Sequence, residues 1–358
     1  MRAQQPIPPP VDTAAPTRVC ITVDTEFSMG GVAADARHQP VAEPMVWCDV
    51  DGRSEGLGFL LHQFARWSIP ATFFVETSHR HHFPHDPMAP IARRIAAHGH
   101  EVQLHVHPCW SVFQHADWQA RLRAQPRQDD FYGRSEDSSL ALIEHGLAAF
   151  RAWRLAPPLA FRSGCLQHDA ALYRALARAG VPYSSNVGLA IFNSGDPAYQ
   201  LYSGRHERHG VAEFPVLTFK DWRVGQHQHH KSLTIAGSSF AETRYLLGQA
   251  RRAGLAQVVI LTHPFEYIQS RDLGRQRARR HGVNQRRLTA LCQFLDCHRD
   301  RFQPCGLAEA ARHDTAANSA SNTLLEGKPW HSLRRMATQV AYDHYGRWAL
   351  AARRGARP

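Results

Sequence analysis

The sequence predicts an α/β fold in which helices cover a parallel sheet. Short β-branched runs alternate with helical patterns over about 300 residues, which is typical of consecutive strand-helix-strand units. No glycine-rich phosphate loop follows the first strand, because the residues there read DTEFSMGG and not GxGxxG. A barrel therefore fits better than an open doubly wound sheet, and in such barrels the chemistry gathers at the C-terminal ends of the strands.

The predicted strands are short apolar or β-branched runs bounded by turn residues. The first, RVCITVD, ends at Asp24, and the last, AQVVILTHP, is strongly apolar. In chain order the predicted strands cover residues 18–24, 70–76, 100–107, 158–164, 181–187, 211–219 and 256–264.

The predicted helices between these strands carry their apolar side chains on one face. The helix over 169–180 has Asp169 as its N-cap and Gly180 just past its end, and the helix over 88–99 ends at Gly99. The other predicted helices cover 56–69, 138–153, 238–254 and 286–300. The histidine-rich stretches 79–86 and 227–231 lie between the periodic segments and are predicted to be solvated loops.

The length and composition fit one large globular domain or two ordinary ones. The 358 residues are 43% hydrophobic and 20% charged, and no apolar run reaches the roughly 18 residues of a membrane span. We expect a disordered, Pro-rich N-terminus over 1–17, a barrel over 18–313, and a polar linker with a basic amphipathic extension over 314–358. The beginning of the chain has no secretory h-region, so a cytoplasmic location is expected.

The cysteine spacing and the distribution of net charge argue against several kinds of site and partner. Seven cysteines without a CxxC pair argue against a disulfide framework and against cysteine-ligated zinc. The net charge of +11 is concentrated in 271–287 and in the last 28 residues, with no aromatic-interleaved RNA-recognition motif, so nucleic acid is an unlikely partner. The C-terminal extension either packs on the barrel, as such tails more often do, or contacts an anionic membrane surface peripherally.

Polar side chains occur where the predicted strands end. They are two carboxylates, three histidines and an arginine: Asp24, Glu26, His105, His107, His263 and Arg162. Each has an ordinary structural explanation when taken alone, as a cap, an ion-pair partner or a backbone contact. Their order at the strand ends predicts that they converge on one rim of the barrel.

This set of side chains contains every group that metal-assisted amide hydrolysis requires. Two imidazoles and a carboxylate are a common ligand set for a catalytic divalent metal, most often Zn²⁺, with Fe²⁺, Co²⁺ or Ni²⁺ as alternatives. The second carboxylate can take a proton from water, the third histidine can protonate the departing nitrogen, and the arginine can keep the free carboxylate ionised. The residues alone leave open whether Asp24 or Glu26 is the ligand.

The chain resembles the polysaccharide deacetylases of the NodB-homology type, the carbohydrate esterase family 4 group. Five segments match in order between residues 18 and 312: ITVDTE, GHEVQLHVHP, FRSG, VPYSSNV and ILTHP. The resemblance implies a distorted (β/α)7 barrel of the NodB/glycoside hydrolase–deacetylase type. It also implies hydrolysis of the N-acetyl group of an amino sugar, in a glycan or a glycan precursor, in surface-polysaccharide metabolism.

The resemblance also assigns roles. Asp24 would be the general base, Arg162 its tether and His263 the general acid, and His105 and His107 would bind the metal. Two positions depart from the family pattern. Thr25 replaces the adjacent second aspartate, for which Glu26 is the natural substitute, and the histidines are two apart where the family has HxxxH. If Glu26 does not reach, Asp24 itself would bind the metal.

Aromatic residues beside the predicted site are candidates for contact with a sugar. Trp110, Phe265 and Tyr267 follow the histidine motifs, and packing in the core is the alternative for all three. Two other functions fit the same residues: a barrel amidohydrolase acting on a small cyclic amide or ureide, and a carbohydrate-binding relative that has lost its metal.

Overall fold

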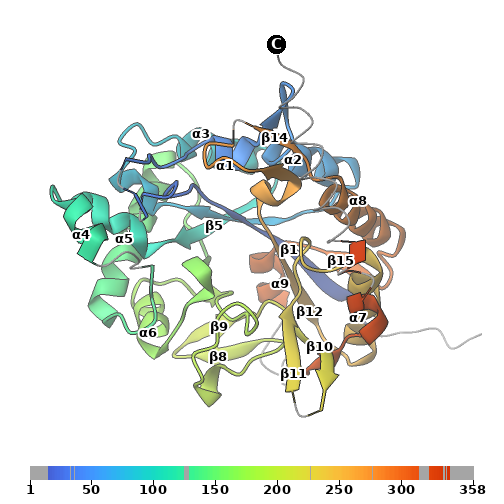
Figure 1. Ribbon diagram of the computed structural model, residues 1–358. Helices are drawn as coiled ribbons and strands as arrows, with labels where there is room; N and C mark the ends of the chain where they lie inside the picture. Colours follow the sequence, from blue (N-terminus) through green and yellow to red (C-terminus); the bar gives the residue numbers. More distant parts are fainter. Residues whose placement is uncertain are drawn as a thin grey trace, which may run out of the picture.

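The fold is a curled, mostly parallel sheet surrounded by helices (Figure 1). The computed structural model describes residues 15–32, 34–35, 37–124, 129–225, 227–275, 277–313, 322–333, 335 and 337–338. In this part of the chain the main sheet has nine strands in the order β12-β1-β4-β5-β6-β7-β9-β8, with β15 paired to β1. Their bounds are β1 (Thr17–Thr25), β4 (Thr72–Glu76), β5 (Glu101–Val106), β6 (Ala160–Ser163), β7 (Tyr183–Ser184), β8 (His206–Arg208), β9 (Val211–Glu213), β12 (Gln257–Thr262) and β15 (Phe302–Pro304).

The sheet closes on itself through single bridges. Every neighbouring pair from β12 through β1 to β9 is parallel. Beyond β9, Val216 bridges to Val259 of β12, and Thr234 bridges to Leu261 of the same strand. The predicted α/β barrel is thus confirmed, and the ring is distorted because only these bridges close it.

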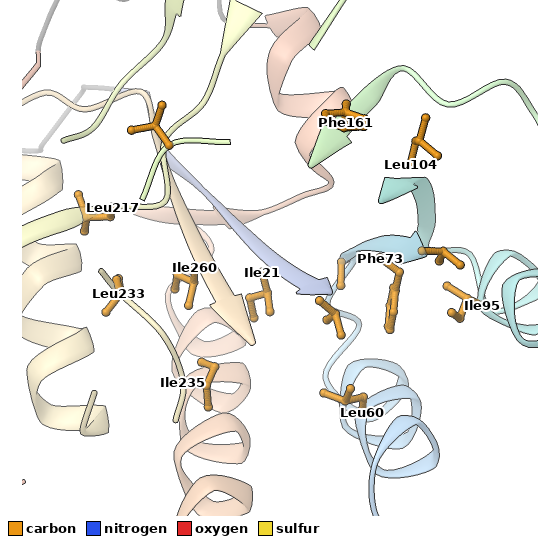
Figure 2. Close-up of a cluster of buried hydrophobic side chains, with 14 of the residues drawn as sticks. Ile21, Leu60, Phe73, Ile95, Leu104, Phe161, Leu217, Leu233, Ile235 and Ile260 are labelled. Atoms are coloured by element: carbon orange, nitrogen blue, oxygen red, sulfur yellow. The ribbon is translucent and has the colours of Figure 1, made fainter. Parts of the chain in front are cut away.

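The helices form an outer layer that covers the sheet. In order they are α1 (Pro44–Trp47), α2 (Leu57–Arg66), α3 (Met88–Ala97), α4 (Trp118–Ala124), α5 (Glu136–Trp153), α6 (Ala170–Arg178), α7 (Phe240–Arg252) and α8 (Gly282–Cys297). Figure 2 shows part of the apolar layer beneath them, where Leu60 of α2 and Ile95 of α3 lie near Phe73 of β4. Ser135 and Asp169 cap α5 and α6, so the predicted cap at Asp169 is confirmed.

A second apolar cluster fills the inside of the barrel. Because side chains alternate along a strand, Cys20, Phe74 and Val259 point inward while their neighbours pack against the helices. The helix α9 (Leu307–His313) joins this inner cluster. Its first N–H groups donate to Glu101 and to the Thr72 hydroxyl, both at the beginnings of their strands, so α9 closes the end of the barrel opposite to the strand C-termini.

Smaller sheets and short 3-10 turns lie outside the main sheet. The hairpin β10 (Thr218–Val224) and β11 (His227–Ser232) adds β16 (Leu325–Glu326), β13 (Ile268–Ser270) pairs with β14 (Ala278–Arg280), and β2 (Asp49–Val50) pairs with β3 (Arg53–Ser54). The 3-10 turns are η1 (Ser78–His81), η2 (Pro108–Gln114), η3 (Gly164–Leu166), η4 (Pro197–Tyr199) and η5 (Pro264–Tyr267).

Three local expectations from the sequence were wrong. The predicted strand over 211–219 is split into β9 and β10, because Pro215 interrupts it and has no N–H for a ladder. The histidine-rich stretch 227–231 is part of strand β11, and the stretch 79–86 buries His79 completely, so neither is a plain solvated loop. Strand β1 begins at Thr17, within the segment 1–17 that was expected to be disordered; residues 1–14 lie outside the described residues.

The described part of the C-terminal extension packs on the barrel. Strand β16 pairs with β10, and the buried Arg335 forms ion pairs with Asp221 of β10 and Glu242 of α7. Residues 314–321 and 339–358, which include most of the predicted linker and of the basic extension, lie outside the described residues. Among the helices that the structure describes, none has the length and apolar character needed to cross a bilayer.

Candidate active site

The six predicted residues meet at one end of the barrel. Across the strands, Glu76 pairs with His105 and His105 pairs with Arg162, so these three side chains share the inner face. Glu26, His107 and His263 each follow directly after their strand, β1, β5 and β12 respectively. The predicted convergence at the strand C-termini is therefore confirmed.

Glu26 and the two histidines form a compact cluster. Glu26 Oε2 lies 3.2 Å from His105 Nε2 and 2.7 Å from His107 Nε2. One ligand atom from each of the three residues lies within 4.8 Å of the other two. Burial alone would raise the pKa of Glu26, but the positive charge of His107 and the hydrogen bonds from both histidines lower it well below its usual value.

The other ring nitrogen of each histidine has a fixed partner. His105 Nδ1 lies 2.8 Å from the carbonyl oxygen of Arg162, and His107 Nδ1 lies 2.7 Å from Asp129 Oδ2. Both acceptors require an N–H at Nδ1, which directs the two Nε2 atoms at Glu26. Metal-binding histidines commonly have this arrangement, and the donor set of two imidazoles and a carboxylate fits Zn²⁺.

Asp129 belongs to the loop before α5 and is almost fully buried. Its Oδ1 accepts from the backbone N–H of Cys109 at 3.2 Å, and its Oδ2 accepts from the Cys165 thiol at 3.7 Å as well as from His107. Burial alone would lower the pKa of His107, but the carboxylates of Asp129 and Glu26 raise it well above its usual value. Asp129 therefore holds the His107 ring from the side opposite to Glu26.

Gly164 has no side chain, and the His107 ring occupies the space where a Cβ atom would lie. A Cβ atom at this glycine would lie 2.4 Å from His107 Nδ1, a distance that real Cβ contacts do not show. The FRSG segment therefore contributes both the arginine and the close approach that lets His107 reach Glu26.

Asp24 is kept apart from the cluster by Arg162. Arg162 Nη1 donates to Asp24 Oδ1 at 2.7 Å and to the Thr22 hydroxyl at 2.8 Å. The guanidinium also donates to the backbone carbonyl and the hydroxyl of Ser185, and it lies 4.3 Å from the centroid of the Phe74 ring. Arg162 is fully buried, so its orientation, and with it that of Asp24, is fixed from several sides.

His263 faces Asp24 from the other side of the site. Its Nε2 lies 4.0 Å from Asp24 Oδ2, and its Nδ1 lies 3.0 Å from Glu266 Oε1. Burial lowers the pKa of His263, but the charges of Glu266, Glu26 and Asp24 outweigh burial and raise it to about 9. The imidazole is therefore protonated at neutral pH and can donate a proton from Nε2.

Among solved structures, a crystal structure from Mycobacterium smegmatis described as a "putative polysaccharide deacetylase" matches 90% of this chain and 98% of its own, with 18% identity and a TM-score of 0.51. The chain has the polysaccharide-deacetylase fold. A family 4 carbohydrate esterase from Streptomyces lividans, in complex with acetate, aligns with 79% of this chain and 89% of its own (12% identity, TM-score 0.38). Peptidoglycan deacetylase PdaC from Bacillus subtilis aligns with 84% of this chain and 93% of its own (11% identity, TM-score 0.37). No protein-family model and no curated protein sequence matches the chain.

On this polysaccharide-deacetylase fold, only one of the three predicted sugar contacts has an accessible position. Trp110 is 1% exposed and Tyr267 is 0% exposed, so both belong to the core, which corrects the expectation that they contact a sugar. Phe265 is partly exposed and stacks on His263 with 4.9 Å between the ring centroids. All three aromatic residues follow a histidine motif in the sequence, so only their burial in the structure distinguishes a sugar contact from a core position.

Three acidic residues of the site were not predicted from the sequence. Glu76, at the end of β4, accepts from the backbone N–H groups of His107 and Ser78 and so fixes the chain after β5. Glu266 could have been found, since it lies three residues after His263 with Pro264 between them, the spacing of a capping position. Asp129 could not, because it lies in a loop rather than at a strand end.

Proposed function

We propose that the protein is a metal-dependent hydrolase that removes N-acetyl groups from an amino-sugar glycan or glycan precursor in surface-polysaccharide metabolism. The observation that carries this proposal is that the two acids at the end of the first strand have different partners. Glu26 lies with the two histidines, whereas Asp24 lies with Arg162 and faces His263. This separation provides both a ligand set and a free carboxylate, as amide hydrolysis requires.

Glu26, His105 and His107 would hold the metal ion, most consistently Zn²⁺, with Co²⁺, Ni²⁺ or Fe²⁺ as alternatives. When bound, a divalent ion lowers the pKa of water and polarises the amide carbonyl. The fixed N–H groups at Nδ1 of both histidines support this assignment, because they leave Nε2 as the ring nitrogen that faces Glu26 and can bind the ion once it has lost its proton.

Asp24 acts as the general base in this proposal. Its carboxylate takes a proton from water as the oxygen attacks the carbonyl carbon of the N-acetyl group. The buried Arg162 guanidinium lies 2.7 Å from Asp24 Oδ1 and aims this carboxylate at the site, so Arg162 is a positioning residue.

His263 acts as the general acid. It gives its Nε2 proton to the sugar nitrogen while the carbon-nitrogen bond breaks, which releases acetate and a free amine. Glu266 keeps that proton in place until the bond breaks, because its negative charge stabilises the imidazolium.

The test combines metal analysis with acetate release. Purified protein is assayed on N-acetylated chitooligosaccharides and on nucleotide-linked N-acetylglucosamine, with the variants Asp24→Asn and His105→Ala. Asp24→Asn should lose about 100- to 10,000-fold of the activity and keep its metal, consistent with the usual contribution of a general base. His105→Ala should lose both.

Loss of metal in Asp24→Asn would show that Asp24 is a ligand and that the division of roles is wrong. A wild-type protein that binds metal but releases no acetate, and opens cyclic ureides instead, would identify a small-amide hydrolase. A folded wild-type protein that takes up no metal would favour a carbohydrate-binding role.

A further inference from the structure

An arginine-rich hairpin follows directly after His263. Between Ile268 and His281 the sequence contains five arginines and a single acid, Asp272. The hairpin consists of β13 and β14 and is joined to His263 by the single turn η5. The basic segment noticed in the sequence therefore lies at the rim of the active site.

Ring stacking connects one of these arginines to the general acid. The Phe265 ring stacks on His263 with an interplanar angle of 28°, and the Arg275 guanidinium lies 5.5 Å from the centroid of the Phe265 ring. Because both groups contact the same Phe265 ring, the guanidinium lies no more than about 10 Å from the His263 ring. Arg275 also has a positive φ of 58°, a conformation that is uncommon for a side chain of this size.

Two acids near the hairpin, Asp272 and Glu55, have partners within the protein. Asp272 accepts from the Ser270 hydroxyl and from the backbone N–H of Arg277. Glu55 lies 3.8 Å from Arg280 and accepts from the Gln285 amide. With five arginines and one acid between Ile268 and His281, the hairpin itself carries a net positive charge.

Arginine suits an oxyanion here better than a neutral sugar. The planar guanidinium matches phosphate oxygens with two parallel hydrogen bonds, and the Phe265 ring beneath it limits its rotation. Further arginines on the same hairpin, Arg271 and Arg277, are exposed to solvent and raise the local positive potential.

We propose that Arg275 binds a phosphate or diphosphate group attached to the amino sugar, so that the substrate is a phosphate-linked precursor and not a neutral polymer. This inference rests on the proposed deacetylase function. A nucleotide-linked and a polyprenyl-linked amino sugar present the same diphosphate chemistry.

The experiment compares wild type, Arg275→Gln and the control Arg252→Gln. Arg252 is an exposed arginine at the end of α7, just before β12 begins, so it lies at the opposite end of the barrel from His263. The metal-loaded proteins are assayed for acetate release from UDP-N-acetylglucosamine, from a short polyprenyl-diphosphate N-acetylglucosamine and from neutral chitotetraose. Binding of UDP-N-acetylglucosamine is measured in parallel by calorimetry.

Arg275→Gln should lower kcat/KM about 10- to 100-fold for at least one diphosphate substrate, leave chitotetraose within about twofold, and weaken binding of that diphosphate compound, as expected for a lost charge-assisted hydrogen bond. Arg252→Gln should match wild type. The diphosphate substrate that is affected identifies the source. Equal losses on all three substrates, or no loss on either diphosphate substrate, would overturn the proposal while leaving the deacetylase function intact.

If wild type releases no acetate from any substrate, the proposed function fails, and calorimetry still decides on the anion site. Binding of UDP-N-acetylglucosamine that is weakened only by Arg275→Gln would support the site. Absence of binding, or equal binding by both variants, would overturn it.

Discussion

Replacing Asp129 with asparagine tests whether a residue that orients a metal ligand, without binding the metal itself, contributes to metal affinity. Asp129 never touches Glu26 in the structure; it contacts His107 through the far ring nitrogen, at 2.7 Å. Asparagine keeps the shape of the side chain but has a single acceptor oxygen. Its amide NH₂ must then face either His107 Nδ1 or the backbone N–H of Cys109, both of which are donors.

The expected loss of metal affinity follows from these contacts. A hydrogen bond to a charged, buried group contributes about 1.5–3 kcal/mol, which corresponds to a 10- to 150-fold change in an equilibrium constant. Loss of an acceptor behind a metal-binding histidine usually costs about 10- to 100-fold, in agreement with that range. The Kd for Zn²⁺ should therefore rise about 10- to 100-fold in Asp129→Asn.

The measurement is a competition titration against a chromogenic zinc chelator, made on the folded protein without substrate. Asp130→Asn is the matched control, because Asp130 is the next residue, is exposed and loses the same charge. His105→Ala sets the level expected when a ligand is missing. A Kd for Asp129→Asn within about twofold of wild type, or equal to that of Asp130→Asn, would refute the idea that Asp129 orients His107.

Two further predictions concern the other residues that shape the site. Because Glu266 helps to raise the pKa of His263 to about 9, activity that needs the imidazolium should fall as pH rises through that pKa. In Glu266→Gln the fall should begin at lower pH, and NMR titration of His263 should give a lower pKa; an unchanged pKa would contradict the role of Glu266. Gly164→Ala should displace the His107 ring and weaken metal binding by at least about tenfold, as an orienting-residue mutant does, whereas Gly248→Ala on α7 should bind metal like wild type.

The alternation of strands and helices was predictable because each strand of a covered parallel sheet is buried on both faces. Continuous apolar runs such as that of β12 therefore stand out in the sequence. The hairpin β10–β11 was missed because its second strand is composed of polar and histidine residues without apolar alternation. Pairing with β10, which in turn pairs with the distant β16, makes β11 a strand although its own sequence does not indicate one.

The central residues of the site were predictable for a topological reason. Strand ends in a parallel barrel share one rim, so Asp24, His105 and His263 had to be neighbours whatever their separation in sequence. Residues that hold these groups from outside the strands are different. Asp129 reaches His107 from a loop whose path no local pattern determines, and the burial of Trp110 depends on how η2 packs.

The buried Arg335 shows that the folding unit extends further than the barrel. The guanidinium lies 2.7 Å from Asp221 Oδ2 and 2.6 Å from Glu242 Oε1, and Ser332 donates to the same aspartate. A protein shortened to end after α9 would keep every strand of the ring, yet Asp221 and Glu242 would lose the arginine that pairs with both, and Asp221 would keep only the contact with His229 Nδ1 at 3.2 Å among its ion pairs with described residues. Removing one partner of a buried ion pair costs about 3–5 kcal/mol, a large part of the 5–15 kcal/mol that stabilises a typical domain. Expression of this protein for crystallography should therefore retain the chain through at least residue 338, even though the proposed catalytic groups all precede residue 267.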